Sequence, residues 1–281
     1  MDALLLEPFR EDFMRTGALA AMLVGVLCGA VGCLVVVRGM ALLADSFAHG
    51  VLPGVAVAVL LTAGATGEAD RFGVLLGALA GGVLTAVGTA LILRRSGLRE
   101  DTATAVMFVF MLALGVVLIS RVSNFAIDLA ALLFGDVLSV PASELPLTAG
   151  LTLVALGAVA VLYRPFVLVA LDPRRAAALG VRVGATELAL MVLLAVAVVV
   201  GFRVVGALLV LGLLIAPPAA AALVTRRLPT MMLVSSLLAA VSGPLGLLLS
   251  WHLDVAAGAS IVLVAVALFF GVLAARSFTV S

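Results

Sequence analysis

The stretch MALLADSFAHGVLPGVA, residues 40–56, places an aspartate, a histidine and a proline inside an otherwise apolar run. The rest of the chain is equally apolar: its 281 residues are 65% hydrophobic, with a mean hydropathy of +1.39. A soluble core does not need that much apolar surface. The apolar residues also lack the period-two alternation of an outer-membrane barrel. We therefore predict an all-α, polytopic transmembrane helical bundle that forms one domain over residues 1–281.

Apolar segments long enough to cross ~30 Å of hydrocarbon follow one another along the chain. We predict about nine spans, at roughly 16–37, 40–61, 72–93, 102–120, 144–163, 187–202, 204–224, 230–250 and 256–274. Merging the two segments that flank Arg203 would give eight spans instead. Residues 129–140 are too few to span, which favours a re-entrant or interfacial helix.

The arginines predict the orientation of these spans. If the segment RRSGLRED at 94–101 is cytoplasmic, only five of the sixteen arginines fall outside, and the remaining eleven satisfy the positive-inside rule. The five outer residues are Arg10, Arg15, Arg71, Arg121 and Arg203. With nine spans the N-terminus is then outside and the C-terminus is cytoplasmic, whereas eight spans would place the C-terminus outside.

The basic residues also limit the function. All sixteen are arginines, and a Walker-type nucleotide loop requires a lysine. If ATP drives this protein, another chain must bind it, so the chain is not expected to be an enzyme by itself. The net charge of only +1 argues against a nucleic-acid partner.

Asp45 and His49 form the candidate site. They are four residues apart, so they share one helix face with side chains about 5–6 Å apart. Counted from residue 40, His49 lies roughly 14 Å along the helix, close to the middle of the bilayer. Ionisable residues at that depth usually face a cavity and carry function. A carboxylate and an imidazole together suit a divalent transition metal, while a self-satisfied pair that joins helices is the structural alternative.

Prolines interrupt two of the predicted spans. Pro53 lacks the N–H that would bond to the carbonyl of His49, so we predict a helix break at the histidine. Broken helices with freed carbonyls near the midplane recur in transporters. Pro217 and Pro218 repeat the device in the seventh apolar segment, which carries no ionisable side chain and is therefore expected to act in bending or packing.

A hydrophilic stretch on the predicted cytoplasmic side, residues 164–186, is longer than a turn requires. Asp172 is placed to cap a short helix that begins at Pro173, continues through the helix formers at 176–179 and stops at Gly180. Such a helix is suited to docking a soluble partner, or alternatively to lying on anionic lipid. The candidate docking residues are Asp172, Pro173, Arg174, Arg175, Ala178, Leu179 and Gly180.

Three polar residues lie near the predicted outer face. His252 and Asp254, beside Trp251, are typical of interfacial anchors, and a contact with metal at the entrance is the alternative. Asp136 is typical of a loop or helix-terminus aspartate, with the same alternative role along the entrance route.

Taken together, several stretches resemble the permease subunits of zinc and manganese ABC importers, the metal-type ABC-3 family. They are RGMALLADSFAHGVLPGVA, LLFGDVLSV, LDPRRAAALGVRV, RVVGALLVLGLLIAPPAAAALVTRR and SWHLDVAAGASIVLVAVALFF. In that family an aspartate and a histidine four apart precede Leu-Pro-Gly, so Asp45 and His49 match its metal-contacting pair. Residues 172–182 match the segment that docks on the ATPase. Gly50 departs from the alanine that is common after the histidine.

The resemblance implies a homodimeric permease in the plasma or inner membrane. Two cytoplasmic ATPase subunits would drive it, and an extracytoplasmic binding protein would deliver Zn²⁺ or Mn²⁺ as cargo rather than as a tightly bound cofactor. Two other hypotheses stay open. A proton-coupled secondary carrier would use Asp45 and His49 as a relay, and a membrane scaffold would use the pair only for packing. A histidine ligand favours zinc and a carboxylate ligand favours manganese, so this pair does not predict which of the two metals is transported.

Overall fold

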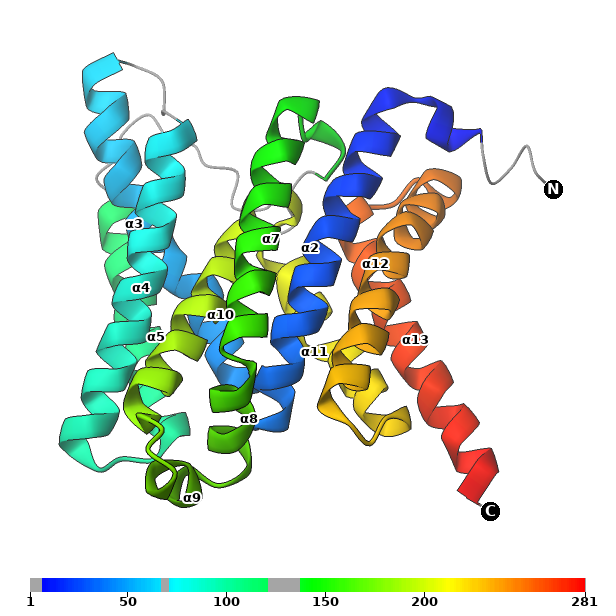
Figure 1. Cartoon of the computed structure of the whole chain (residues 1–281). Coiled ribbons are helices and arrows are strands. Elements are labelled where there is room, and N and C mark those ends of the chain that lie inside the picture. Colours follow the sequence, from blue (N-terminus) through cyan, green and yellow to red (C-terminus); the bar gives the residue numbers. More distant parts are fainter. Residues whose placement is uncertain (1–6, 67–70, 121–136, 281) are drawn as a thin grey trace. The chain divides into compact units, whose positions relative to one another are not determined.

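The protein is all-α in its computed structural model, which describes residues 7–66, 71–120 and 137–280 (Figure 1). The α-helices are α2 (Asp12–Val37), α3 (Ala41–Thr66), α4 (Arg71–Ser96), α5 (Glu100–Ile119), α7 (Leu145–Val161), α8 (Tyr163–Leu171), α9 (Pro173–Ala178), α10 (Val183–Val205), α11 (Ala207–Val224), α12 (Leu228–Leu253) and α13 (Ala257–Val280). Short 3₁₀ helices are η1 (Pro8–Arg10), η2 (Val137–Ser139) and η3 (Ala142–Glu144). The predicted helical fold class is confirmed.

Within the described residues, eight helices are long and apolar enough to cross a membrane, and α11 is a shorter apolar helix. The two segments whose merger would reduce the predicted count are separate helices, because Gly206 stands between α10 and α11 with φ at 81°. Side chains other than glycine rarely adopt this conformation. Of the segment 129–140, only residues 137–140 are described, and they include η2. The orientation of the spans stays a prediction.

The chain divides into two compact units of non-contiguous segments. The first comprises Met1–Gly39, Asp128–Val159 and Val200–Ser281, and the second comprises Met40–Ile127 and Ala160–Val199. The first unit therefore contains α2, α11, α12 and α13 with most of α7. The second contains α3, α4, α5, α8 and α9 with most of α10. A single domain over residues 1–281 stays a prediction.

Small residues bring α2 and α12 together in the first unit. A Cβ atom at Gly29 would lie 2.7 Å from the Cα of Ser236, so only glycine fits there. The Ser235 hydroxyl donates a hydrogen bond to the carbonyl of Gly29 (2.9 Å), and Ser236 donates to the carbonyl of Val26 (3.1 Å). Close approach through small residues and hydroxyl bonds is typical of helices packed within membranes.

The same principle joins α3 to α4 in the second unit. Gly50 and Gly54 on α3 face Gly77 and Gly81 on α4, and each pair is spaced by four residues along its helix. A Cβ atom at Gly54 would overlap the backbone carbonyl of Gly77. Helix α5 then packs on α3, where a Cβ atom at Gly115 would lie 3.4 Å from the ring of Pro53. The proline-containing part of α3 therefore packs against both helices, beside an apolar cavity of about 500 Å³ that Pro53 and Gly54 help to line.

The helices are continuous at the positions of the predicted breaks. Pro53 lies inside α3, and Pro217 and Pro218 lie inside α11, and both helices continue past them. Each proline removes one backbone N–H without ending its helix. Sequence analysis missed a further proline of this kind, Pro244 inside α12.

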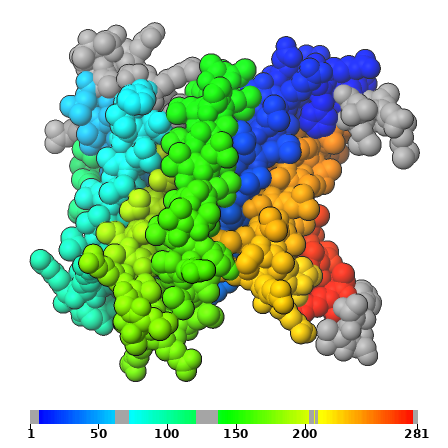
Figure 2. Space-filling model, in the orientation of Figure 1, coloured from blue at the N-terminus to red at the C-terminus, as the bar shows by residue number. Residues whose placement is uncertain are grey.

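Some spans leave much of their surface uncovered. Only 22% of the apolar span that contains α7 is buried, and Figure 2 shows this helix, coloured green, exposed along its length. Its side chains Leu153 and Val154 are 69% and 72% exposed. Surfaces of this composition are suited to contact with hydrocarbon or with another apolar surface.

Gly54→Ala tests the close contact between α3 and α4. Because the added methyl group meets the Gly77 backbone, we expect it to lower the free energy of unfolding by about 1–3 kcal/mol. Gly157→Ala on α7 is the matched control, since a Cβ atom there meets no atom within 4 Å. Thermal unfolding of the purified chain in detergent measures both. Equal effects of the two substitutions would contradict the packing described here.

Candidate metal site

Asp45 and His49 lie on one face of the first half of α3, as predicted. Their side chains remain accessible: 45% of the surface of the Asp45 side chain and 25% of that of His49 are exposed. The neighbouring residues Ala44, Ser46 and Ala48 are buried. The pair therefore lies on a partly exposed face of α3, which it shares with the exposed Leu42, and not in a sealed contact between helices.

The histidine ring is held in one orientation. Its Nδ1 lies 3.0 Å from the backbone carbonyl oxygen of Asp45 and 3.5 Å from the Asp45 Oδ1. A carbonyl oxygen can only accept a hydrogen bond, so Nδ1 carries the proton. In the neutral ring Nε2 then keeps the lone pair, which is the arrangement of a histidine that ligates metal through Nε2.

An aromatic contact supports this ring from the next helix. Phe108 on α5 lies with its ring centroid 5.0 Å from that of His49, and the two rings are nearly perpendicular, at 83°. Edge-to-face packing of this kind restricts rotation of the imidazole. Sequence analysis missed Phe108, because the contact depends on how α3 and α5 pack and not on spacing along the chain.

The backbone behind the pair explains the departure at position 50. A Cβ atom at Gly50 would overlap the Thr85 hydroxyl, which itself donates a hydrogen bond to the Gly81 carbonyl (2.9 Å). A glycine at position 50 is therefore required by a threonine on α4. Pro53 lies four residues after His49 on α3. Because proline has no backbone N–H, it cannot donate a hydrogen bond to the His49 carbonyl.

Two protein donors do not complete a metal site. In residues 7–66, 71–120 and 137–280, no group of three or more histidine, cysteine, aspartate or glutamate side chains converges. Structural zinc sites use four ligands, and catalytic ones use three plus water. Within this part of the chain, Asp45 and His49 can therefore supply only half of a four-ligand set.

The candidate docking segment folds as predicted. Asp172 caps α9, because its Oδ1 accepts hydrogen bonds from the backbone N–H groups of Arg174 (2.9 Å) and Arg175 (3.1 Å). Pro173 is the first residue of α9, and Gly180 ends the turn with φ at 83°. Leu179 is 69% exposed. The predicted capping is confirmed, and the segment presents an apolar side chain beside arginines.

One element next to this segment was not predicted. Helix α8 covers Tyr163–Leu171, where sequence analysis expected the end of a span and a polar stretch. Its Pro165 lies in the first turn, where proline is tolerated, and this was the available signal.

His252 and Asp254, which are predicted near the outer face, belong to the first unit, whereas Asp45 and His49 belong to the second. The exposed His252 lies with Nδ1 2.8 Å from the Leu248 carbonyl oxygen. Asp254 terminates α12 in the left-handed conformation. Asp136 lies outside the described residues.

Comparison with known proteins agrees with these features. A chain in the solved structure of PsaBC from Streptococcus pneumoniae in complex with Fab matches with a TM-score of 0.83 and 33% identity, over 97% of this chain and 95% of that one. The manganese transport system membrane protein MntC of Halalkalibacterium halodurans is 38% identical over 92% of this chain and 85% of its own length. The chelated iron transport system membrane protein YfeD of Yersinia pestis is 35% identical over 95% and 86%.

A family model covers nearly all of the chain. It matches residues 10–276, which include the Asp45–His49 helix, the capped helix α9 and all of α12. The chain belongs to the ABC 3 transport family.

Proposed function

We propose that this chain is the membrane-spanning permease of an ATP-driven importer, and that its cargo is a divalent transition metal, Mn²⁺ first and Zn²⁺ or Fe²⁺ as competitors. The single observation that carries the proposal is the accessible Asp45–His49 pair, in which Nδ1 of the histidine is engaged by Asp45, so that Nε2 is the nitrogen proposed to bind the metal. Several relatives are named for manganese or iron transport. A carboxylate oxygen with an imidazole nitrogen is a donor set that suits such cations.

A second copy of the chain would complete the ligand set. Two-fold symmetry places the same residues of both copies on either side of the axis, so two pairs would supply two carboxylates and two imidazoles. A transport site must also release its ion, which requires binding that is favourable but weak. Exposed ligands on one open helix face meet this requirement better than an enclosed cage.

Energy would come from partner subunits. The chain has no lysine and therefore no Walker loop, so separate cytoplasmic ATPase subunits must bind the nucleotide. The capped helix α9 is proposed as their docking element, with Leu179 as the apolar contact. An extracytoplasmic binding protein would supply the metal at the opposite face, which fixes the direction as import.

His49→Ala tests the metal site. Loss of a ligand from a set of four is expected to lower metal-dependent ATP hydrolysis by about 100-fold in liposomes that contain the chain, its ATPase and its binding protein. The matched control is His252→Ala, the same substitution at the only other histidine of the chain, which is expected to retain most activity. Equal losses in the two variants, measured with Mn²⁺, Zn²⁺ and Fe²⁺ separately, would contradict a ligand role specific to His49.

A pair of substitutions at Asp172 tests the docking element. Asp172→Ala removes the acceptor of both capping bonds at a cost of about 1 kcal/mol to α9. We expect the affinity for the ATPase subunit to fall about fivefold, measured by titration of the purified subunits. Asp172→Asn keeps an oxygen at the capping position and should bind nearly as tightly as the parent. If the asparagine variant loses as much as the alanine variant, the cap is not what positions the docking surface.

The energy source separates the proposal from a proton-coupled carrier. In cells, uptake of metal should continue when the proton gradient is dissipated and ATP is maintained, and it should stop when the ATPase subunit is inactivated. The reverse result would favour a proton relay through Asp45 and His49. If Asp45→Ala and His49→Ala lower thermal stability while metal uptake persists, the pair acts as a scaffold.

A further inference from the structure

A cavity of about 640 Å³ opens in the first unit, where the start of α2, the end of α12 and the start of α13 meet. It is lined by residues from segments that are distant in sequence, among them Phe13, Val137 and Trp251. Helices α2, α12 and α13, which begin or end here, are each long and apolar enough to cross a membrane, so we expect the cavity near the membrane surface. The metal mechanism uses none of its apolar walls.

Two aromatic rings and one carboxylate line this cavity together. The ring centroids of Phe13 and Trp251 are 6.4 Å apart with the planes tilted by 35°. Both rings are partly exposed, at 41% and 49%. Asp254 follows on the same wall, and its φ of 52° is the one positive value among the non-glycine residues that the structure describes. Aromatic faces beside a carboxylate are a recognition pattern for organic cations.

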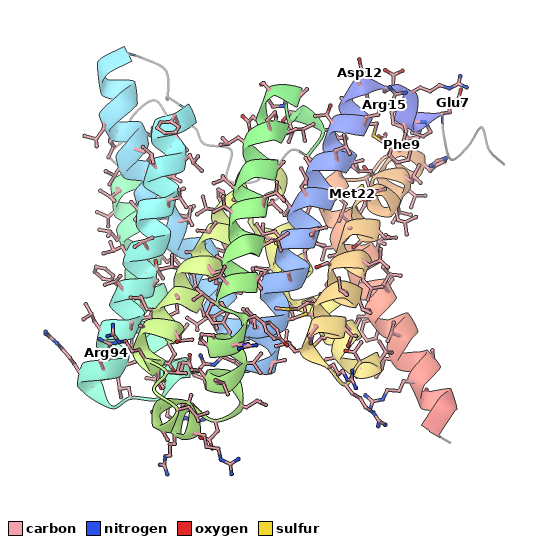
Figure 3. All side chains as sticks on the ribbon, in the orientation of Figure 1. Glu7, Phe9, Asp12, Arg15, Met22 and Arg94 are labelled. Atoms are coloured by element: carbon pink, nitrogen blue, oxygen red, sulfur yellow. The ribbon has the colours of Figure 1, made fainter. Side chains whose placement is uncertain are left out.

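The carboxylate of Asp254 is available to a ligand. No hydrogen bond or ion pair links it to another described side chain. Arg15, at the start of α2, does not line the cavity; its guanidinium donates to the Phe9 carbonyl and lies 4.0 Å from Asp12. Figure 3 shows Phe9, Asp12 and Arg15 together at the N-terminal end of α2. The described residues therefore give Asp254 no bonded cation of their own.

The apolar lining of the cavity favours an amphiphile. Met14, Val137 and Leu247 line the same cavity and are almost fully buried behind its surface. A cation with no apolar portion would leave this wall unfilled, and a purely apolar ligand would bury the carboxylate without a partner, which is costly. A molecule with an ammonium group at one end and hydrocarbon at the other complements both the carboxylate and the apolar lining.

The charge of the neighbouring helix end adds a further condition. Ala257 and Gly258 line the cavity at the start of α13, where the first backbone N–H groups of a helix have no partner within it. This end favours a negative group, while Asp254 favours a positive one. The two together fit a zwitterion, although the aromatic pair and the carboxylate are the features that define the site.

We propose that this cavity binds the headgroup of an aminophospholipid, phosphatidylethanolamine. Its primary ammonium group hydrogen-bonds to Asp254 and lies over the faces of Trp251 and Phe13, and its glycerol and first acyl carbons lie against Met14 and Leu247. A primary ammonium donates hydrogen bonds to a carboxylate, which a choline headgroup cannot do. The site would make the outer end of α12 a lipid-binding element, and its existence does not depend on which metal is transported.

Intrinsic tryptophan fluorescence reports on this site, because Trp251 is the only tryptophan of the chain. The purified full-length chain in detergent is titrated with short-chain phosphatidylethanolamine, phosphatidylcholine and phosphatidylglycerol while tryptophan fluorescence is followed. We expect phosphatidylethanolamine to produce the tightest saturable change. Asp254→Asn should weaken it about tenfold, because a charged hydrogen bond is lost. Asparagine tolerates the left-handed conformation, so the variant keeps the fold.

Glu11→Gln is the matched control, since it removes an acid from the start of α2 that makes no side-chain capping bond and does not line the cavity. It should bind phosphatidylethanolamine like the parent. Equal affinity for the three lipids, or an Asp254→Asn variant that binds as tightly as the parent, would overturn the proposal. So would tighter binding of arginine amide than of phosphatidylethanolamine, because the cavity would then fit a basic side chain of a protein partner.

Discussion

A carboxylate and an imidazole within an apolar membrane helix impose the constraint on which the rest of this structure depends. Neither group is stable in hydrocarbon without a polar partner or access to water. Asp45 and His49 partly satisfy each other through the bond between the ring Nδ1 and the Asp45 backbone, yet both side chains keep exposed surface. On the same helix, Gly50 and Gly54 pack closely against α4, and Gly115 of α5 approaches the ring of Pro53. Tight packing and accessible ligands on one helix describe a helix that presents a site.

Much of this arrangement could be predicted from local sequence. Long apolar runs indicate membrane helices, because hydrocarbon leaves the backbone no other partner than itself. The spacing of Asp45 and His49 places them on one helix face whatever surrounds that helix. The capping of α9 by Asp172 and its termination at Gly180 are likewise local, because both depend on residues within one turn. Such features follow from geometry that the neighbouring residues alone determine.

The remaining features depend on contacts between distant segments. Phe108 supports the His49 ring only because α5 packs on α3, and Gly50 is required only because Thr85 lies opposite on α4. The lipid cavity combines residues near positions 13, 137 and 251, which no spacing rule connects. Helices α3 and α11 also continue through their prolines, since neighbouring helices can hold a helix that has lost one backbone bond, and the bend at each proline stays a prediction. Packing between helices that are distant in sequence, and not the helix propensity of local residues, determines these features.

The central claim is that a passing dication meets the Nε2 atom of His49 beside Asp45. Pulsed electron paramagnetic resonance of Mn²⁺ bound to the full-length chain in lipid tests it most directly, with isotopically labelled histidine to identify the nitrogen. The account predicts a hyperfine coupling from a directly bound imidazole nitrogen that persists in His252→Ala and disappears in His49→Ala. A Mn²⁺ spectrum without nitrogen coupling, or one that keeps its coupling after His49 is removed, would contradict it.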